Sequence, residues 1–527
     1  MNEKDKSELK KKFKESTNRP DISFEKMINQ LEIFEKGVPY IHLFKRCTVG
    51  DGIVNLSNED EIKYLNLFER KAGDFDITKF VPASGAASRM FKKLEVLMIT
   101  KSLTFSEVKK RAEDGNADCS AAVKFIEDIK NFAFSSDLQN RIGSDGNDIN
   151  QWLKEENYQK IIEYTITEIG LNYSNLPKGA IKFHRYIEEC RTAFEEHLIE
   201  ALNYCNGTNN ISKIHFTISH EHQKEFDKII DGFRKRKSIS SESLIIDFSN
   251  QKKSTNTVAV DVNNKPFYDK NGNIVFRPGG HGALLQNLDG IDSDFIFIKN
   301  IDNVCHDHFK GDTFRFKKIL GGILISLQKK MFKYLPVLLK ENVRNNYLSE
   351  VINFAKNELQ IHIPDDILNL PADEKRKYLF KLLNRPIRVC GMVLNEGHPG
   401  GGPFWVIDQN NKISKQVVEK SQVDPDNQQQ MKILNSATHF SPVDFVCGVK
   451  DYRGSKFKLD EFSNPNSGLI TNKTFEGREL KALELPGLWN GGMANWISIF
   501  VQVPGTTFNP VKEVNDLLLQ AHQPLNS

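Results

Sequence analysis

Apolar positions in the N-terminal part of the chain recur at helical spacing, with interruptions between the repeats. Met27, Leu31 and Phe34 lie three or four residues apart, and the same spacing returns between Ile62 and Phe68. An apolar residue at every third or fourth position is typical of an amphipathic helix. The pattern therefore predicts a helical N-terminal cap over residues 1–75.

The spacing of apolar residues changes after residue 75. A short strand-like run ends at Val81, the small residues of Ser84–Ser88 follow, and a helical pattern begins near Met90. This order predicts a strand, a tight turn and a helix. Long charged segments with helical spacing then fill residues 100–175, and they predict a helical insertion.

Beyond the insertion, predicted helices and strands alternate. Helices are expected over 191–202 and 223–233, and strands over 214–218, 244–248 and 295–298. Alternation of this kind favours an α/β fold with a mostly parallel sheet, whose ligands bind at the carboxyl ends of the strands. We expect residues 76–440 to form this core and residues 441–527 to form a smaller α+β unit, with a terminal helix over 511–519.

Length and composition narrow the class of protein. The 527 residues exceed a single ordinary domain, and 72 Lys and Arg against 69 Asp and Glu leave a net charge of +3. Since no long block carries one sign of charge, a dedicated nucleic-acid binder is excluded. No segment has the roughly 20 apolar residues of a membrane span, and the charged N-terminus lacks the apolar stretch of a secretory signal. We expect a soluble cytoplasmic protein that contacts neither nucleic acid nor membrane.

The metal-binding potential of the cysteines and histidines is low. The seven cysteines are scattered and never form a Cys-x-x-Cys pair, so disulfides and a thiolate zinc site are not expected. His306 and His308 are two residues apart, which would place them on different faces of a helix, and no fourth zinc ligand is evident.

Two segments carry candidate phosphate-binding groups. The small side chains of Ser84–Ser88 would let backbone N–H groups approach a phosphate, and Arg89 would add a fixed positive charge. A plain tight turn is the alternative. Lys178 follows Pro177, which stiffens the chain and gives the ammonium group a defined direction; a solvated loop lysine is the alternative.

Three further segments carry other candidate groups. Three glycines around His281 would permit a flat ligand to approach the backbone, although a turn that opens a helix explains them equally well. Asp302 follows the apolar run Phe295–Ile298, where a carboxylate could hold Mg²⁺ against phosphate oxygens or cap the next helix. The turn that contains Asn490 is a candidate lining of a sugar pocket, with an ordinary turn as the alternative.

The order of these segments resembles a known family. The matching pieces are Ser84–Met90, Leu176–Gly179, Gln251, Pro278–Gly282, Asn300–Asn303, Val417–Ser421 and Asn509–Leu519. In this order they are similar to the nucleotide-sugar pyrophosphorylases, above all the UDP-glucose and UDP-N-acetylhexosamine branch, and within it to an uncharacterised bacterial family of about this length. The resemblance runs from about residue 80 to residue 519.

The resemblance implies a Rossmann-like nucleotidyltransferase core with a GT-A-like mixed sheet, and it implies a role for each matching position. Phosphate groups would be held by Ser84, Gly85, Ala86, Ala87, Ser88, Arg89, Lys178 and Lys512, and the base by Gln251, Gly280, His281 and Gly282. Asp302 would hold Mg²⁺, and Glu419, with Asn490 as a further candidate, would contact the sugar. The family usually has glycines where this chain has Ser84 and Ala87, and it lacks the long insertion before Lys178.

The implied reaction joins a nucleoside triphosphate, UTP by preference, to a sugar 1-phosphate and releases pyrophosphate. Since a phosphate monoester is already an anion near pH 7, the nucleophile needs no general base. The demand is for positive charge and alignment, which Mg²⁺, arginine and lysine supply. A glycosyltransferase on a related core and a catalytically inactive sugar-nucleotide-binding protein are the alternatives.

Overall fold

The computed structural model describes residues 3–16, 20–99, 103–397 and 400–525. The chain divides into two compact units. Unit 1 comprises Met1–Lys71, Gln251–Ile298 and Lys318–Val503, and unit 2 comprises Ala72–Asn250, Lys299–Lys317 and Pro504–Ser527. Each unit is therefore assembled from three separate stretches of sequence.

Unit 2 is built around parallel strands. Strand β4 (Ile77–Pro82) pairs with β7 (Ser212–Thr217), which pairs with β8 (Leu244–Ser249), and both pairings are parallel. A short antiparallel hairpin joins β5 (Lys182–Arg185) to β6 (Cys190–Thr192). The helices of this unit are α4 (Ser88–Ile99), α5 (Phe105–Glu113), α6 (Ala117–Glu127), α7 (Ser135–Ser144), α8 (Ile149–Lys154), α9 (Tyr158–Ile166), α10 (Ala193–Tyr204) and α11 (Gln223–Lys237).

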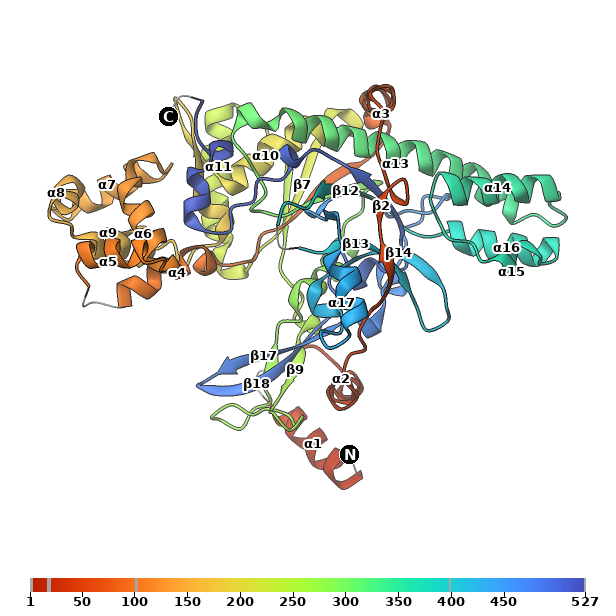
Figure 1. Cartoon of the computed structure of the whole chain (residues 1–527), viewed down its shortest axis with the longest axis horizontal. Coiled ribbons are helices and arrows are strands. Elements are labelled where there is room, and N and C mark those ends of the chain that lie inside the picture. The colour runs from red at the N-terminus through yellow and green to blue at the C-terminus, as the bar shows by residue number, and fades with distance from the viewer. Residues whose placement is uncertain (1–2, 17–19, 100–102, 398–399, 526–527) are drawn as a thin grey trace. The chain divides into compact units, whose positions relative to one another are not determined.

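Helices α5 to α9 form the helical cluster that the charged segments predict, visible around the labels α5–α9 in Figure 1. Thr104 and Glu107 cap the start of α5 reciprocally, side chain to backbone in both directions. Inside the cluster the ring centroids of Phe132 and Phe134 lie 5.0 Å apart, and the ring of Tyr173 meets that of Phe134 edge-on. The insertion thus has an aromatic core of its own.

Unit 1 contains a mixed sheet and two smaller sheets. The strand order in its mixed sheet is β2 (Thr48–Val49), β3 (Gly52–Val54), β19 (Ile497–Gln502), β12 (Ile387–Leu394), β16 (Asp444–Gly448) and β11 (Phe295–Lys299), whose last residue is counted in unit 2. Strand β12 is parallel to β19 and antiparallel to both β16 and the short β15 (His439–Phe440). One smaller sheet has the strand order β1 (His42–Arg46), β13 (Gly402–Ile407) and β14 (Ile413–Val418). The other has the order β10 (Phe276–Arg277), β9 (Thr257–Val260), β18 (Arg478–Glu484) and β17 (Leu469–Phe475).

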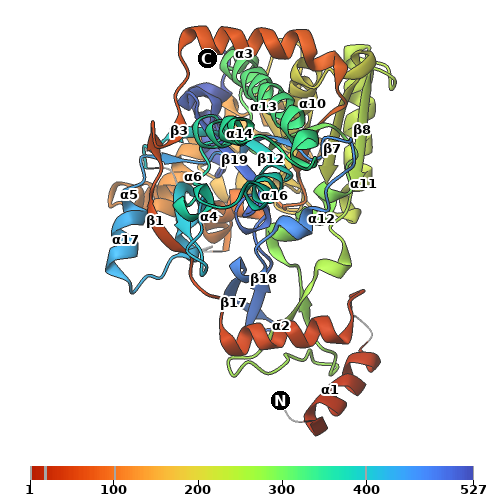
Figure 2. The same cartoon turned by 90° about the vertical axis from the view of Figure 1, so that its right-hand side faces the viewer.

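The N-terminal helices of unit 1 cover one of the smaller sheets. Leu31 and Phe34 of α2 (Phe24–Lys36), with Phe13 of α1 (Glu3–Glu15), are buried against Val258 and Leu483 of strands β9 and β18. Figure 2 shows α1 and α2 beside these strands. The remaining helices of the unit are α3 (Asn58–Lys71), α12 (Leu285–Asp289), α14 (Asn345–Asn357), α15 (Asp365–Leu368), α16 (Ala372–Leu383), α17 (Gln428–Asn435) and α13 (Lys310–Leu338), whose first residues are counted in unit 2.

The prediction of an α/β protein with a mixed sheet is confirmed, and the strands expected near residues 77, 214, 244 and 295 are present. Two expectations about elements are wrong. The N-terminal region holds the short strands β1 to β3 between its helices, so it is not purely helical. The expected helix over 511–519 is only a 3-10 segment, Val514–Leu518, because Val511 donates its N–H to the carbonyl of Asp302 and Asn303 pairs with Pro510. Among the described residues, no helix is long and apolar enough to cross a membrane.

Candidate phosphate-binding site

One carboxylate oxygen in unit 2 receives two lysine ammonium groups. Lys178 Nζ lies 3.0 Å and Lys512 Nζ 2.8 Å from Oδ2 of Asp302. The side chains of Asp302 and Lys178 are buried, while that of Lys512 is 55% exposed. Three residues up to 334 positions apart in the sequence, all singled out from the sequence, therefore meet in one cluster.

Backbone pairing holds two members of this cluster in place. The N–H of Val511 donates to the carbonyl oxygen of Asp302 at 3.0 Å, and Asn303 and Pro510 form an isolated β-bridge. The side-chain oxygen of Asn303 also accepts from the N–H of Asn509 at 2.9 Å. The segment that carries Lys512 is thus fastened to the turn that carries Asp302.

The small-residue turn after β4 is joined to the Lys178 segment. Lys178 donates its backbone N–H to Gly85 at 3.2 Å, Ala87 donates to Leu176 at 2.9 Å, and Ala86 pairs with Pro177. The two ends of the insertion therefore meet, so the long insertion leaves the two predicted motifs adjacent. Gly85, Ala86 and Ser88 are exposed, and Arg89 is exposed in the first turn of α4.

Close packing explains the glycine after Lys178. A side chain at Gly179 would place its Cβ 3.2 Å from the ring of Phe226 and 3.3 Å from Ile301, which is tighter than ordinary van der Waals contact. The lack of a side chain lets the Lys178 turn approach the residue that precedes Asp302. This approach brings the ammonium group of Lys178 within reach of the carboxylate.

Burial and ion pairing shift the pKa values of Asp302 and Lys178 in opposite directions. Burial raises the pKa of Asp302, but the ammonium groups of Lys178 and Lys512 outweigh it and hold that pKa below its usual value. Burial lowers the pKa of Lys178, and the attraction of Asp302 only partly offsets this effect. Two ammonium groups surround the Asp302 carboxylate, and the carboxylate of Asp516 also attracts Lys178. The two lysines can offer N–H donors and positive charge to an anion.

A second group of predicted residues meets in unit 1. The His281 ring stacks on that of Trp489, with centroids 4.3 Å apart, and its Nδ1 accepts from the backbone N–H of Leu488 at 3.2 Å. A Cβ on Gly282 would lie 2.2 Å from the carbonyl oxygen of Pro486, so only glycine fits there. Burial lowers the pKa of His281, while the nearby carboxylates of Glu419 and Glu484 oppose that shift.

Glu419 and Asn490 are linked through Gln422. The side-chain oxygen of Gln422 accepts from the backbone N–H of Glu419 at 3.0 Å and from the amide of Asn490 at 3.1 Å. Gln251 reaches the same region indirectly, since it donates to Thr255 Oγ1 at 3.4 Å and the carbonyl of Thr255 abuts Gly279. The residues expected to contact base and sugar therefore gather in unit 1.

Sequence reasoning missed two side chains that support this second group. Arg388, on β12, is fully buried and donates to the carbonyl of Trp489 and, at 2.8 Å, to Ser498 Oγ. Its position inside an otherwise apolar strand is the signal that could have identified it. Gln422 has no comparable signal, because a glutamine that follows a strand is ordinary in sequence.

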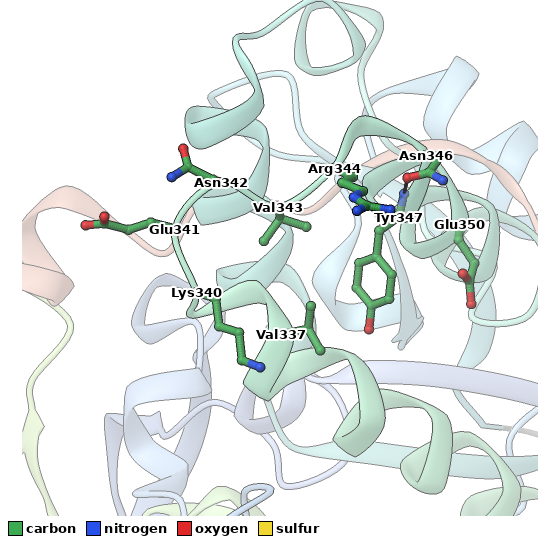
Figure 3. A pocket seen from close by; sticks show the side chains of 9 residues that line it. All are labelled: Val337, Lys340, Glu341, Asn342, Val343, Arg344, Asn346, Tyr347 and Glu350. Carbon is green, nitrogen blue, oxygen red and sulfur yellow. Dashed lines mark hydrogen bonds between the residues drawn. The ribbon is translucent and has the colours of Figure 1, made fainter.

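The cavity in Figure 3 lies elsewhere in unit 1. It measures about 380 Å³ and is lined by the turn between α13 and α14, where Lys340, Arg344 and Tyr347 surround it. None of the residues singled out from the sequence lines this cavity.

The residues around Asp302 do not by themselves form a cage for Mg²⁺. Among the described residues, no group of three or more His, Cys, Asp and Glu side chains is arranged to hold a metal. In phosphoryl-transfer sites, however, Mg²⁺ is held by one or two carboxylates together with substrate phosphates. A single carboxylate beside two lysines fits that donor set, with the substrate supplying the remaining oxygens.

Comparisons with known proteins give a family and a set of solved structures. A family model described as "Domain of unknown function (DUF4301)" matches residues 10–523. The structure is similar to UDP-N-acetylglucosamine pyrophosphorylase from Trypanosoma brucei, with 11% identity, 94% of this chain and 74% of that chain covered, and a TM-score of 0.46. It is also similar to UDP-glucose pyrophosphorylase from Leishmania major, with 11% identity, coverage of 98% and 79%, and a TM-score of 0.39. A comparison with curated proteins found no match.

Proposed function

We propose that this chain, which belongs to the DUF4301 family, is a nucleotidyltransferase that forms a UDP-sugar and pyrophosphate from UTP and a sugar 1-phosphate. The observation that carries the proposal is the meeting of Lys178 and Lys512 on one oxygen of Asp302. The order of motifs, which resembles nucleotide-sugar pyrophosphorylases, supplies the reaction class. We assign the mixed sheet to the Rossmann-like, GT-A-like type on the same ground.

The proposed reaction needs positive charge more than it needs a base. A phosphate oxygen of the sugar 1-phosphate attacks the α-phosphorus of UTP, the bond to the bridging oxygen breaks, and pyrophosphate leaves with the negative charge. Lys178 and Lys512 neutralise charge on the phosphates, and Arg89, with the exposed turn Ser84–Ser88, binds the triphosphate. None of these groups has to take up or release a proton in this step.

We expect Mg²⁺ to bind together with the triphosphate. When bound, it would neutralise phosphate charge, with Asp302 as its protein ligand. As the phosphates bind, the lysines exchange part of their interaction with Asp302 for interactions with phosphate oxygens.

The residues gathered in unit 1 complete the assignment. Gln251, Gly280 and Gly282 are proposed to face the uracil base, and His281 to support it through its stacked, uncharged ring. Glu419 and Asn490 are proposed to bind sugar hydroxyls, since a carboxylate and an amide together accept and donate hydrogen bonds. Arg388 and Gln422 are positioning residues for the Asn490 turn.

The test is exchange of labelled pyrophosphate into UTP in the presence of a UDP-sugar and Mg²⁺. We expect exchange in the wild-type protein and its loss in Asp302→Ala and Lys178→Met. Lys109→Met is the matched control, because Lys109 is an exposed lysine of unit 2 whose described contacts, an ion pair with Glu127 and the ring of Phe105, lie within the insertion. It should leave exchange unchanged.

Other outcomes would overturn the proposal in distinct ways. Binding of UDP-sugar without any exchange identifies a sugar-nucleotide-binding protein. Transfer of the sugar to an acceptor, independent of pyrophosphate, identifies a glycosyltransferase.

A further inference from the structure

A small cavity in unit 1 gathers positive charge away from the residues assigned above. It measures about 40 Å³, and its lining includes Arg385, Lys412 and Lys415 together with Trp405 and Trp496. No aspartate or glutamate lines it among the described residues. Three cationic side chains therefore border a space that offers them no carboxylate partner.

The described contacts of these cations are mostly to neutral groups, although the carboxylate of Asp408 attracts Lys412. Arg385 donates only to carbonyl oxygens, those of Leu382 at 2.8 Å and Asn495 at 3.2 Å. Lys415 donates to the carbonyl of Leu359 and the side-chain oxygen of Gln360, both at the long distance of 3.3 Å. Across the described part of the chain, none of the three cations forms an ion pair.

Lys415 is the deepest of the three. Its side chain is buried between the rings of Trp405 and Phe500, each 5.8 Å from Nζ. Burial lowers the pKa of Lys415 to about 8, and the attraction of Asp51 opposes this only weakly. Burial likewise lowers the pKa of Arg385, to about 10. Both shifts record the same unmet need for negative charge.

A neutral donor of the same lining is also unsatisfied. Trp496 is 3% exposed, and its indole Nε1 is a buried donor with no hydrogen-bond partner among the described residues. Buried donors of this kind normally find a partner in a folded protein. A bound anion would accept from this N–H as well as from the cations.

The small cavity continues into a wider hollow. The two share Gln360, His362 and Trp405 in their linings, and the hollow measures about 490 Å³. Asp51 is the one carboxylate on the lining of this hollow in the described residues, and it is already engaged by Lys45 at 2.6 Å and by Trp405 Nε1 at 3.1 Å. The wider hollow offers room for an organic group attached to an anion in the small cavity.

We propose that this cavity is a second anion site, built for a phosphate group that is either free or carried by a small phosphate monoester. Arg385, Lys412 and Lys415 hold the phosphate oxygens, the Trp496 indole donates to one of them, and the organic part of a monoester lies in the hollow beside Trp405. No residue of the proposed catalytic machinery lines either space. The site is therefore a place for an effector, and its ligand need not be a substrate.

The number and arrangement of the cations favour phosphate over a carboxylate. A phosphate monoester carries close to two negative charges at pH 7, whereas a carboxylate carries one. An arginine fork and two lysines around one small space match three phosphate oxygens. The small volume suits a single tetrahedral group.

The test measures the melting temperature against phosphate concentration at constant ionic strength, with chloride as the balancing anion. The parent protein is K178M/D302N/K512M, which removes the charges of the proposed catalytic cluster, so failure of the proposed function does not affect the result. The probes are inorganic phosphate and glucose 6-phosphate. We expect a saturable rise in melting temperature with either probe, and a tighter dissociation constant for glucose 6-phosphate if its sugar occupies the hollow.

Two substitutions added to this parent separate the site from its alternatives. Lys415→Met and Arg385→Gln should each weaken phosphate binding about tenfold or more, the loss expected for a charge-assisted hydrogen bond. Lys458→Met is the control, since that lysine is 80% exposed and lies outside both linings; it should leave the phosphate response intact. Absence of a saturable shift in the parent, or an unchanged shift in both Lys415→Met and Arg385→Gln, overturns the proposal. If Lys415→Met fails to fold, Arg385→Gln alone decides.

Discussion

The side-chain amide of Asn515 donates a hydrogen bond to the backbone carbonyl oxygen of Ala121 at 2.8 Å. Ala121 belongs to α6 of the helical insertion, and Asn515 lies three residues after Lys512. Glu513, between them, forms an ion pair with Lys93 of α4 at 2.7 Å. The insertion is therefore in contact with the segment that presents Lys512 to Asp302, which gives it a positioning role.

The first prediction concerns Asn515. Asn515→Ala removes the contact with α6, so the Lys512 segment becomes less ordered, and we expect the KM for UTP to rise about threefold to tenfold with kcat changed less. That range corresponds to the roughly 0.5–1.5 kcal/mol of one hydrogen bond. Steady-state kinetics of UDP-sugar formation measure it. Glu513→Gln is the control, because it removes the ion pair with Lys93 but leaves an amide oxygen that can still accept the capping hydrogen bond from Asp516, and it should change KM by less than about twofold. Equal effects of the two substitutions would contradict a specific role for Asn515.

The second prediction separates catalysis from stability within the Asp302 cluster. Lys512 is half-exposed, so Lys512→Met should lower the free energy of unfolding by less than about 1 kcal/mol. Asp302→Ala leaves the buried Lys178 without its counter-charge and should lower it by about 3 kcal/mol. Both variants should lose about 100-fold or more in kcat/KM, the usual loss when one group that stabilises transition-state charge is removed. Urea unfolding and kinetics on the same preparations measure the two quantities. Full activity of Lys512→Met would remove that residue from the mechanism.

The local pattern of the chain was sufficient to predict much of unit 2. The apolar run before Asp302 and the small-residue turn after Val81 are short-range signals. The apolar run predicted the strand that it forms, and the turn marked the end of the strand before it. The pairing of Asp302 with Lys178 and Lys512 could be expected only from the order of motifs. Nothing in their spacing, 124 and 210 residues from Asp302, encodes the contact.

The failures have a common physical origin in tertiary hydrogen bonding. The apolar residues around Val514 have helical spacing, yet the backbone at Val511 pairs with Asp302 and leaves only a 3-10 turn. Arg388 lies in an apolar strand and Lys415 in a mixed one, and the contacts of both depend on residues from remote segments that periodicity does not reveal. Local propensity cannot report such contacts, because tertiary context routinely overrides it.

The third prediction concerns the buried carboxylate of Glu200. Glu200 is fully buried and accepts from Lys79 at 2.7 Å and Lys299 at 2.8 Å. Glu200→Ala leaves both lysines buried without a counter-charge and should lower the free energy of unfolding by about 3–5 kcal/mol. Lys79→Met should lower the free energy of unfolding far less, because Lys299 still neutralises Glu200 and burial already lowers the pKa of Lys79 to about 8. Urea unfolding of the two variants measures the difference, and equal losses would contradict this account.

The fourth prediction is a loss of stability in mild acid that arises from buried histidines of unit 2. His184 lies between Glu196 and His522, each 2.9 Å away, and His306 stacks on Tyr186 with ring centroids 4.2 Å apart. Burial lowers the pKa of all three histidines, that of His306 to about 4. Between that value and the ordinary pKa of about 6.5, the unfolded chain binds more protons than the folded chain, so stability falls as the pH falls through this range.

Melting temperatures between pH 8 and pH 4.5 test this prediction. We expect a plateau above about pH 6.5 and a fall below it, and a shallower fall in His306→Gln, whose amide keeps a donor for the carbonyl of Arg185 but does not titrate. The carboxylate of Glu196 affects stability only at lower pH. Burial raises its pKa, but Lys310 and His184 outweigh this effect and hold that pKa below the ordinary 4.5. His42→Asn, at an exposed histidine of unit 1, is the control and should reproduce the wild-type profile. A wild-type profile that is flat from pH 8 to pH 5 would show that these histidines are not buried as neutral groups.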